Sequence, residues 1–236
     1  MCNKIIVALD VESKEKAGQW VEKISGHVGL FKVGKQLFTA AGPDVVTLIK
    51  EAGGGVFLDL KFHDIPNTVA AASVQALRLG VDMLNVHALG GYEMMAKTAD
   101  EVNKEAHSSG REKPILIAVT ILTSMNDKGL EEAGIMTPVA DEVVKLASLA
   151  KRAGLDGVVA SPQEIKIIKE TCGEDFVVVT PGVRPSFASM DDQKRVMTPL
   201  EAVRAGADYL VIGRPVTKAE DPLRAISLIE EELCQG

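Results

Sequence analysis

Residues 204–212 read RAGADYLVI, and they decide the fold because they place a glycine between the end of a helix and the start of a strand. Gly206 suits the position just past a helix terminus, and Tyr209 begins a β-rich run. The same order occurs at residues 78–82 (RLGVD) and 152–157 (RAGLDG), and AAG at residues 40–42 is expected to act in the same way. The chain therefore repeats a unit of helix, glycine and strand.

Eight such β-rich runs occur, and a polar, helix-forming stretch follows each of them. The expected strands are residues 4–9, 29–34, 55–60, 82–87, 115–120, 156–160, 176–180 and 208–212. The expected helices are residues 13–24, 44–52, 68–79, 93–105, 138–153, 163–170, 200–205 and 221–232. Strict alternation predicts parallel strands joined by right-handed crossovers.

Eight units in 236 residues, about 29 residues each, predict an α/β fold, a single (β/α)8 TIM barrel. No linker divides the chain, so residues 1–236 are expected to form one catalytic domain with its active site at the C-terminal ends of the strands. An open, doubly wound sheet is the alternative. It is disfavoured because Ala8-Leu9-Asp10 continues the first strand where a GxGxxG motif would be required.

Composition excludes several classes of protein. The chain is 46% hydrophobic and 25% charged, which is typical of a globular protein. No apolar run has the length of a membrane span or of a signal peptide. Cys2, Cys172 and Cys234 form no CxxC pair, which argues against a disulfide framework or a zinc site and favours a cytoplasmic location. The net charge of −7, with no lysine or arginine run, argues against a nucleic-acid partner.

Charged side chains fall where the interior of a barrel is normally apolar. Residues 56–68 read VFLDLKFHDIPNT. Because strand side chains alternate between faces, Leu58, Leu60 and Phe62 share one face and Asp59 and Lys61 share the other. The aliphatic face is expected to pack on the helices, so Asp59 and Lys61 are expected to point into the barrel near its top.

The same alternation brings further charges to this place. Asp10 ends the first strand on its inner face, and Lys32 points inward from the second. Asp10, Lys32, Asp59 and Lys61 are therefore expected to converge, and such a charged cluster contributes less stability than an apolar core would. Non-catalytic alternatives remain open. Asp59 and Lys61 form a structural ion pair in one of them, and Asp10 caps the helix near Ser13 in another.

Two further residue types have structural interpretations. Asp64 precedes Ile65-Pro66, as an N-cap followed by a proline in the first helical turn would. His63 and His87 lie at strand ends without a partner nucleophile or a second ligand, so structural roles are favoured for both.

A phosphate site is predicted after the seventh and eighth strands. Gly213 permits close approach of the backbone to a ligand, and Arg214 supplies a guanidinium for an anion. Arg184 and Gln193 lie in the long connection after strand seven, residues 181–198, where an incidental surface arginine is the alternative. Residues 120–124, in the connection after strand five, offer hydroxyl groups that could bind a polar heterocycle. The alternative is that they form only a helix cap or a turn.

Taken together, these segments resemble the orotidine 5′-monophosphate decarboxylase family over nearly the whole chain. The resemblance rests on ALD at Asp10, FKVG at Lys32, LDLKFHDIPNT from Leu58, NVHALGG from Asn85, AVTILTS from Ala118, TPGVRP from Thr180 and GRPVTKAEDP from Gly213. It implies conversion of orotidine 5′-monophosphate to uridine 5′-monophosphate and CO₂ in pyrimidine synthesis. It also implies a homodimer in which Asp64, Ile65 and Thr68 complete the partner's site.

The resemblance implies a role for each site residue. Lys61 would stabilise and protonate a C6 carbanion, Asp59 would lie near the departing carboxylate, and Lys32 with the partner's Asp64 would complete the charge network. Asp10 and Lys32 would contact the ribose, and Thr123 and Ser124 the pyrimidine. The residues expected at the phosphate or beside it are Pro181, Arg184, Gln193, Gly213 and Arg214. No pyridoxal phosphate, thiamine or metal pattern is present, so no cofactor is expected.

Two other functions stay open. One is a magnesium-dependent sugar-phosphate decarboxylase or aldolase of the same superfamily, such as 3-keto-gulonate-6-phosphate decarboxylase. Residues 65–68 (IPNT), Arg184 and Gln193 argue against it. The other is a non-catalytic sensor of nucleotide phosphate, which would not need Asp59, Lys61 and Lys32 at one barrel mouth.

Overall fold

Eight parallel strands close into a barrel in the order β1 to β8 in the computed structural model, which describes residues 4–186 and 197–234. The strands are β1 (Ile5–Ala8), β2 (Leu30–Gly34), β3 (Val56–Phe62), β4 (Met83–His87), β5 (Ile115–Val119), β6 (Gly157–Val159), β7 (Val177–Pro181) and β8 (Tyr209–Ile212). Each strand end lies within two residues of its expected position. The predicted (β/α)8 barrel is therefore confirmed.

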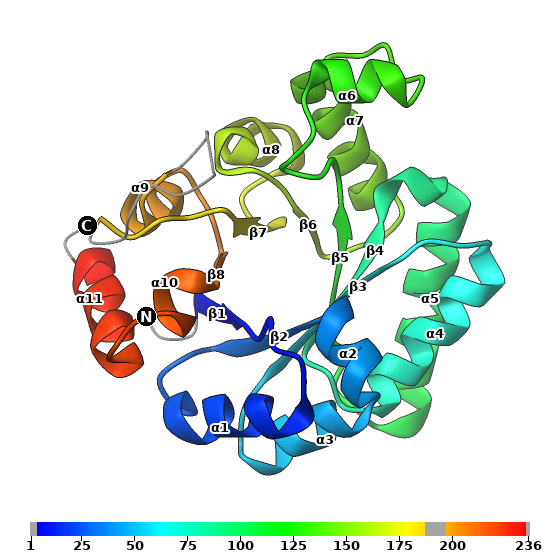
Figure 1. Ribbon diagram of the computed structural model, residues 1–236. Coiled ribbons are helices and arrows are strands. Elements are labelled where there is room, and N and C mark those ends of the chain that lie inside the picture. The colour runs from blue at the N-terminus through cyan, green and yellow to red at the C-terminus, as the bar shows by residue number, and fades with distance from the viewer. Residues whose placement is uncertain (1–3, 187–196, 235–236) are drawn as a thin grey trace.

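Helices surround the barrel, as Figure 1 shows. They are α1 (Lys14–Ile24), α2 (Lys35–Ala41), α3 (Asp44–Glu51), α4 (Pro66–Arg78), α5 (Gly91–Ser109), α6 (Asp127–Glu132), α7 (Val139–Arg152), α8 (Ile165–Cys172), α9 (Pro199–Arg204), α10 (Arg214–Thr217) and α11 (Pro222–Cys234). Two short 3₁₀ turns, η2 (Ala88–Gly90) and η3 (Pro162–Glu164), follow β4 and β6. The sequence did not predict α2, α6 or α10.

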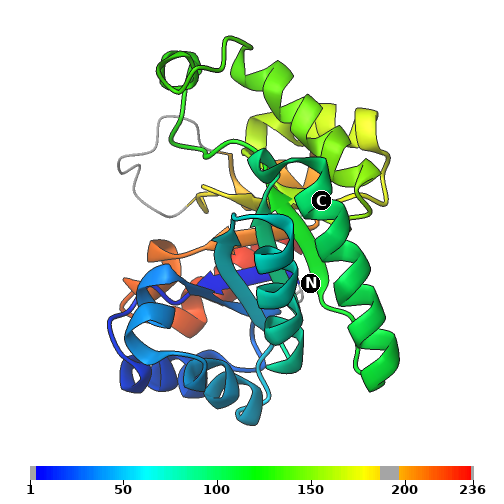
Figure 2. The same ribbon diagram turned by 90° about the vertical axis from the view of Figure 1, so that its right-hand side faces the viewer.

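Two of these short helices correct the sequence interpretation. Gly42 ends α2 with φ 61°, and α3 follows it, so the prediction that AAG leads into a strand was wrong. The α6 helix stands outside the main ring of helices (Figures 1 and 2) and occupies the long connection after β5.

Apolar side chains form two concentric layers. Inside the barrel, a small cluster contains Ile6, Leu30, Phe57, Met83, Ile117 and Val179. Between strands and helices, a much larger cluster includes Leu58, against which Leu60 and Phe62 pack. The expected division of β3 is therefore confirmed, because its aliphatic residues face the helices while Phe57 fixes the inward face. Asp59 lies two residues after Phe57, on the C-terminal side of this small apolar cluster inside the barrel.

Helix starts near the predicted site differ from two expectations. Ser13 caps α1, and its hydroxyl accepts a hydrogen bond from the backbone N–H of Lys16 at 3.3 Å, so Asp10 is not the cap. Ile65 occupies the N-cap position of α4, with Pro66 in the first turn. The Asp64 carboxylate lies one residue earlier and accepts from the backbone N–H of Ile65 at 2.6 Å. The N-cap interpretation of Asp64 was therefore wrong.

In the part of the chain that the structure describes, no helix combines the length and the hydropathy needed to cross a bilayer.

Candidate active site

Four charged side chains meet at the C-terminal ends of β1, β2 and β3. The Lys32 ammonium lies 3.2 Å from Asp10 Oδ1 and 3.5 Å from Asp59 Oδ2. The Lys61 ammonium lies 2.5 Å from Asp59 Oδ1. In space the four side chains form a row in the order Asp10–Lys32–Asp59–Lys61, and each charge is next to one of opposite sign. This arrangement confirms the convergence that strand alternation predicted.

The cluster is shielded at its centre and open at one end. The side chains of Lys32 and Asp59 are 12% and 13% exposed, and that of Lys61 is 26% exposed. Asp10 is 65% exposed, so the row runs from the barrel interior to its rim. Each of the inner charges has an opposite charge within ion-pair distance, which offsets the cost of desolvation. A ligand arriving at this mouth meets ordered ammonium and carboxylate groups.

Lys61 adopts an unusual backbone conformation. Its φ is 54°, and it is the one non-glycine residue with positive φ in residues 4–186 and 197–234. The pairing of β3 with β4 shifts register between Leu58 and Phe62, so the chain bulges around Lys61. A left-handed conformation in a lysine costs of order 1–3 kcal/mol and requires support from its surroundings. Such outliers cluster at functional sites.

Asn85 of β4 supplies part of that support. Its side-chain carbonyl accepts the backbone N–H of Lys61 at 2.8 Å, and its amide donates to Asp59 Oδ1 at 2.7 Å. Asn85 is 1% exposed. Sequence reasoning missed this residue, although the same alternation rule would have found it: Asn85 lies two residues after Met83, which faces the barrel interior.

His63 and His87 stack beside the cluster, with ring centroids 5.4 Å apart and planes inclined by 22°. Burial is the main cause that lowers the pKa of His87 from its ordinary value to about 4, and the charges of His63, Lys61 and Lys35 add to the effect. His87 is therefore neutral at neutral pH. Its Nδ1 accepts a hydrogen bond from the backbone N–H of Leu89 at 3.4 Å, which agrees with the structural role that the sequence favoured.

The predicted phosphate end adjoins the charged row. A Cβ placed on Gly213 would lie 3.6 Å from the Ala8 Cβ and 3.9 Å from Asp10 Oδ2, so the start of α10 and the end of β1 are neighbours. Arg214 is the first residue of α10. The structure therefore brings Gly213 and Arg214 to the same barrel mouth as Asp10.

Arg184 is buried in the connection after β7, at 8% exposure, and its Nε has no hydrogen-bond partner among the described residues. Its backbone N–H donates to the carbonyl of Met197 at 3.0 Å, which ties the two ends of this connection together. Pro181 ends β7. A buried guanidinium N–H without a partner is costly, and an anionic ligand would satisfy it. Gln193 lies outside the described residues.

The other predicted residues are exposed in the single chain. Thr123 and Ser124 are exposed in the connection between β5 and α6. Asp64, Ile65 and Thr68 are exposed at the start of α4, and Ile65 is 65% exposed. The Asp64 carboxylate accepts from the backbone N–H of Ile65, and no ion pair joins it to the charged row among the described residues.

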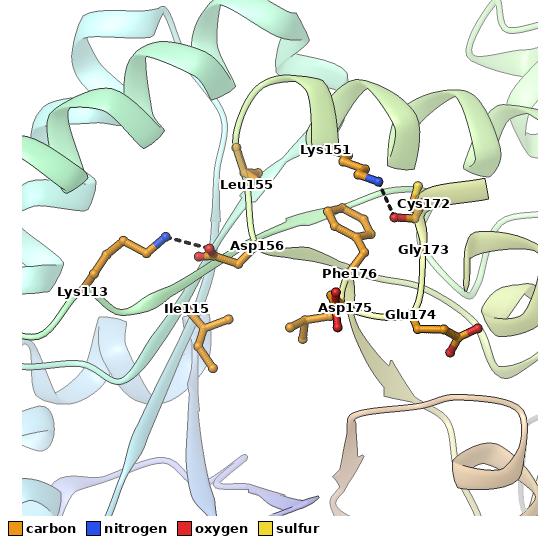
Figure 3. Close-up of a pocket in the computed structure, with 11 residues that line it drawn as sticks. Lys113, Ile115, Lys151, Leu155, Asp156, Cys172, Gly173, Glu174, Asp175 and Phe176 are labelled. Atoms are coloured by element: carbon orange, nitrogen blue, oxygen red, sulfur yellow. Dashed lines mark hydrogen bonds and ion pairs between the residues drawn. The ribbon is translucent and has the colours of Figure 1, made fainter. Parts of the chain in front are cut away.

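A separate cavity of about 620 Å³ lies at the opposite end of the barrel, beside the starts of β5 and β7 (Figure 3). Two lysines on its wall already have partners. Lys113 lies 2.6 Å from Asp156 Oδ1, and Lys151 donates to the carbonyl of Cys172 at 2.6 Å. Burial raises the pKa of the Cys172 thiol above its ordinary value, so this thiol is a poor nucleophile. The charged row is the better candidate for chemistry.

The described residues contain no group of three or more His, Cys, Asp or Glu side chains able to hold a metal ion. The charged row and its buried neighbour consist of two aspartates, two lysines and Asn85. Both aspartates of the row already form ion pairs with lysine ammonium groups.

Comparison with known proteins agrees with this geometry. The model of the orotidine 5′-phosphate decarboxylase / HUMPS family matches residues 3–229. Orotidine 5′-phosphate decarboxylase of Geotalea daltonii is 60% identical over 233 residues, covering 99% of this chain and 97% of the relative. The protein of the same name from Geobacter sulfurreducens is 59% identical over the same coverage. The crystal structure of orotidine 5′-phosphate decarboxylase from Lactobacillus acidophilus superposes with a TM-score of 0.86 at 39% identity, covering 97% of this chain and 98% of that one. A charged row at the mouth of a closed barrel and these matches along its length place the chain in the orotidine 5′-phosphate decarboxylase / HUMPS family.

Proposed function

We propose that this protein converts orotidine 5′-monophosphate to uridine 5′-monophosphate and CO₂ in pyrimidine nucleotide synthesis, without a cofactor. The alternating row Asp10–Lys32–Asp59–Lys61 carries the proposal. Relatives about 60% identical over nearly the whole chain bear the name of this activity. Such a reaction needs fixed charges at the reacting carbon, and this row supplies them.

Loss of CO₂ from C6 of the pyrimidine leaves an electron pair in an sp² orbital that the ring cannot delocalise. Stabilisation must therefore come from the surrounding electrostatics. In our proposal the bond from C6 to the carboxylate breaks, its electron pair stays on C6, and the Lys61 ammonium lies beside it. A Lys61 proton then forms the new C6–H bond, and water restores the ammonium. Because Lys61 already pairs with Asp59 at 2.5 Å, little reorganisation is needed.

Asp59 has two roles in this proposal. Its Oδ1 holds Lys61 and its Oδ2 faces Lys32, so the carboxylate fixes both cations. Its negative charge also lies close to the substrate carboxylate, where it favours departure of CO₂. Asp10, at the exposed end of the row, and Lys32 next to it would contact the ribose hydroxyls.

Recognition of the remainder of the nucleotide is assigned to the neighbouring connections. Thr123 and Ser124 would contact the pyrimidine from the segment before α6. Arg184, Gln193, Gly213 and Arg214 would bind the phosphate, with Pro181 at the end of β7 beside them. The buried, partnerless Nε of Arg184 supports this assignment, because a phosphate oxygen would satisfy it.

The decisive experiment follows the absorbance of orotidine 5′-monophosphate after addition of purified protein in EDTA. We expect rapid loss of substrate absorbance, and no loss with the Lys61→Ala variant, which should retain the thermal midpoint of the wild type. Activity that disappears in EDTA would favour the magnesium-dependent alternative. Binding of uridine 5′-monophosphate without turnover would instead favour a sensor.

We further propose a cytoplasmic homodimer in which Asp64, Ile65 and Thr68 complete the partner's site. Their exposure in the single chain is compatible with this, because exposed side chains are accessible to a second copy of the chain. The buried, unpaired Cys172 thiol is compatible with a reducing compartment.

Mixed dimers test the shared site. Lys61→Ala and Asp64→Ala subunits are each expected to be inactive alone. In a hybrid, one site carries both changes, while the other contains the intact Lys61 of one subunit and the intact Asp64 of its partner. Random mixing should therefore restore about a quarter of wild-type activity. If Asp64 acted in its own subunit's site, mixing would restore none.

A further inference from the structure

We propose that Asn85 is a positioning residue for the reaction, which fixes both the backbone of Lys61 and the carboxylate of Asp59 with a single amide. The inference rests on the proposed function, because it assigns Asn85 to the same charged row. Asn85 is 1% exposed, so it acts through these two residues rather than on the substrate.

The two hydrogen bonds of Asn85 run to different parts of the row. Its Oδ1 accepts the backbone N–H of Lys61 at 2.8 Å, and its Nδ2 donates to Asp59 Oδ1 at 2.7 Å. The first bond supports the left-handed conformation of Lys61, whose φ is 54°. That conformation sets the direction in which the Lys61 side chain leaves the strand.

The second bond controls the rotation of the Asp59 carboxylate. Asp59 Oδ1 accepts from both the Lys61 ammonium, at 2.5 Å, and the Asn85 amide. Asp59 Oδ2 is thereby left to face Lys32, at 3.5 Å. Without the amide, one oxygen loses a buried donor and the carboxylate is free to turn between the two lysines. The separation of the two cations would then no longer be fixed.

Only a neutral group that both donates and accepts can serve at this position. Leucine would preserve much of the volume but leave the Lys61 N–H and one lone pair of Asp59 unsatisfied, at about 1–3 kcal/mol for a buried group. Ionised aspartate would accept the Lys61 N–H but repel Asp59. A protonated aspartic acid has the shape of asparagine and again offers one donor and one acceptor. This difference makes Asn85→Asp the sharpest variant.

The test measures kcat and the affinity for uridine 5′-monophosphate in the wild type, Asn85→Leu and Asn85→Asp. At pH 7 we expect kcat to fall about 10²-fold in both variants, because displaced catalytic groups lose rate steeply. Product affinity should be unchanged, because Asn85 does not contact the ligand. Thr98→Val is the matched control: Thr98 is also fully buried, but its hydroxyl bonds only within α5, to the carbonyl of Met94 at 2.7 Å. Its kcat should equal that of the wild type.

The pH profile separates positioning from a merely structural role. Two neighbouring carboxylates share one proton with a raised apparent pKa. As pH falls, the new carboxyl at position 85 becomes a donor to Asp59, so kcat of Asn85→Asp relative to wild type should rise. Lys32, Lys61 and His87 also face this region, but they are present in both proteins, so the ratio of the two kcat values reports the change at position 85.

Each outcome decides the matter. If the wild type turns over substrate and both variants keep wild-type kcat, the positioning role is wrong while the proposed function stands. If Asn85→Asp loses activity equally at every pH, the donor to Asp59 is unimportant and the inference fails. If Asn85→Leu does not fold, the acid-dependent recovery of Asn85→Asp decides alone. A wild type without turnover would instead overturn the proposed function.

Discussion

Lys32 has little free space around its ammonium group. Asp10 and Asp59 hold the Nζ from two sides, at 3.2 and 3.5 Å. On a third side lies Gly34, where a Cβ would stand only 3.1 Å from the same Nζ. The backbone of Gly34 is extended, with φ −90°, and any residue can adopt it. A side chain here would therefore press on the Lys32 ammonium and move it by a few tenths of an ångström, so the glycine matters for the space it leaves rather than for its conformation.

Gly34→Ala should displace the Lys32 ammonium and lower kcat/KM for orotidine 5′-monophosphate about 10-fold or more, with an unchanged fold. Steady-state kinetics and circular dichroism measure the two effects. Gly18→Ala is the control, because its Cβ would meet only Leu48, at an ordinary 3.4 Å. Its activity should equal that of the wild type. Full activity in Gly34→Ala would show that the position of Lys32 tolerates movement.

Single residues also show where sequence reasoning works and where it stops. Alternation along β1, β2 and β3 sufficed to place Asp10, Lys32 and Asp59 together. It could not show that Lys61 is left-handed, because that conformation depends on a hydrogen bond to Asn85 from the neighbouring strand. The N-cap of α4 was misplaced by one residue, since a proline in the first turn is compatible with either Asp64 or Ile65 at the cap.

At the scale of elements, one device recurs at the N-terminal end of the barrel. An aspartate just before an even-numbered strand accepts a backbone N–H of the preceding strand and pairs with a lysine. The three examples are Asp82 with Val56 and Lys50, Asp156 with Leu116 and Lys113, and Asp208 with Val178 and Lys169. The motifs GVD, GLDG and GADY each contain one of these aspartates. We call these groups the aspartate clamps.

The Asp208 clamp is the most deeply buried of the three at its lysine. Lys169 is 6% exposed and also donates to the carbonyls of Glu174 and Phe176, whereas the Lys50 side chain is 37% exposed. Asp208→Ala should therefore destabilise the fold by about 2–4 kcal/mol, because a buried cation loses its counter-ion. Asp82→Ala is the matched control and should cost less.

Thermal unfolding measures this difference, and kcat/KM should not change in either variant because the clamps lie away from the charged row. An equal loss of thermal midpoint in the two variants would contradict the importance of burial.

The order of elements was predictable because β-rich runs, and a glycine near the end of several helices, are local signals. The short helices α2, α6 and α10 were not predicted, since each is only four to seven residues long and lies in a connection between a strand and a longer helix. The bulge in β3 was not predicted either. It is a shift of register between Leu58 and Phe62 in the pairing with β4, and the sequence of β3 alone does not show how the two strands pair.

At the scale of the whole molecule, the charged row and the predicted phosphate site are neighbours at the barrel mouth but come from opposite ends of the chain. Asp10 follows β1, and Gly213 follows β8, which pairs with β1. Closure of the barrel thus brings the two together. In the proposed function, a substrate phosphate bound at one side of the mouth would position the pyrimidine over Lys61, so that binding energy far from C6 would contribute to the rate.

Arg214→Ala should lower kcat/KM for orotidine 5′-monophosphate by about 10²-fold, since the proposed charged contact to the phosphate would be lost. Decarboxylation of orotidine, which has no phosphate, should change little. Comparing the two substrates in both enzymes measures this coupling. An equal loss for both substrates would mean that Arg214 supports the fold or the pyrimidine site instead.

The aspartate clamps have a consequence for how this barrel can change during evolution. They join neighbouring strands at the N-terminal end of the barrel, while the residues proposed to bind and convert the substrate lie at its C-terminal end. Mutations at the C-terminal end of the barrel leave the aspartate clamps unchanged, so substrate specificity can change without a loss of the stability that the clamps provide. Proteins that evolve from such a barrel are expected to diverge at its C-terminal end while they keep an aspartate before β4, β6 and β8.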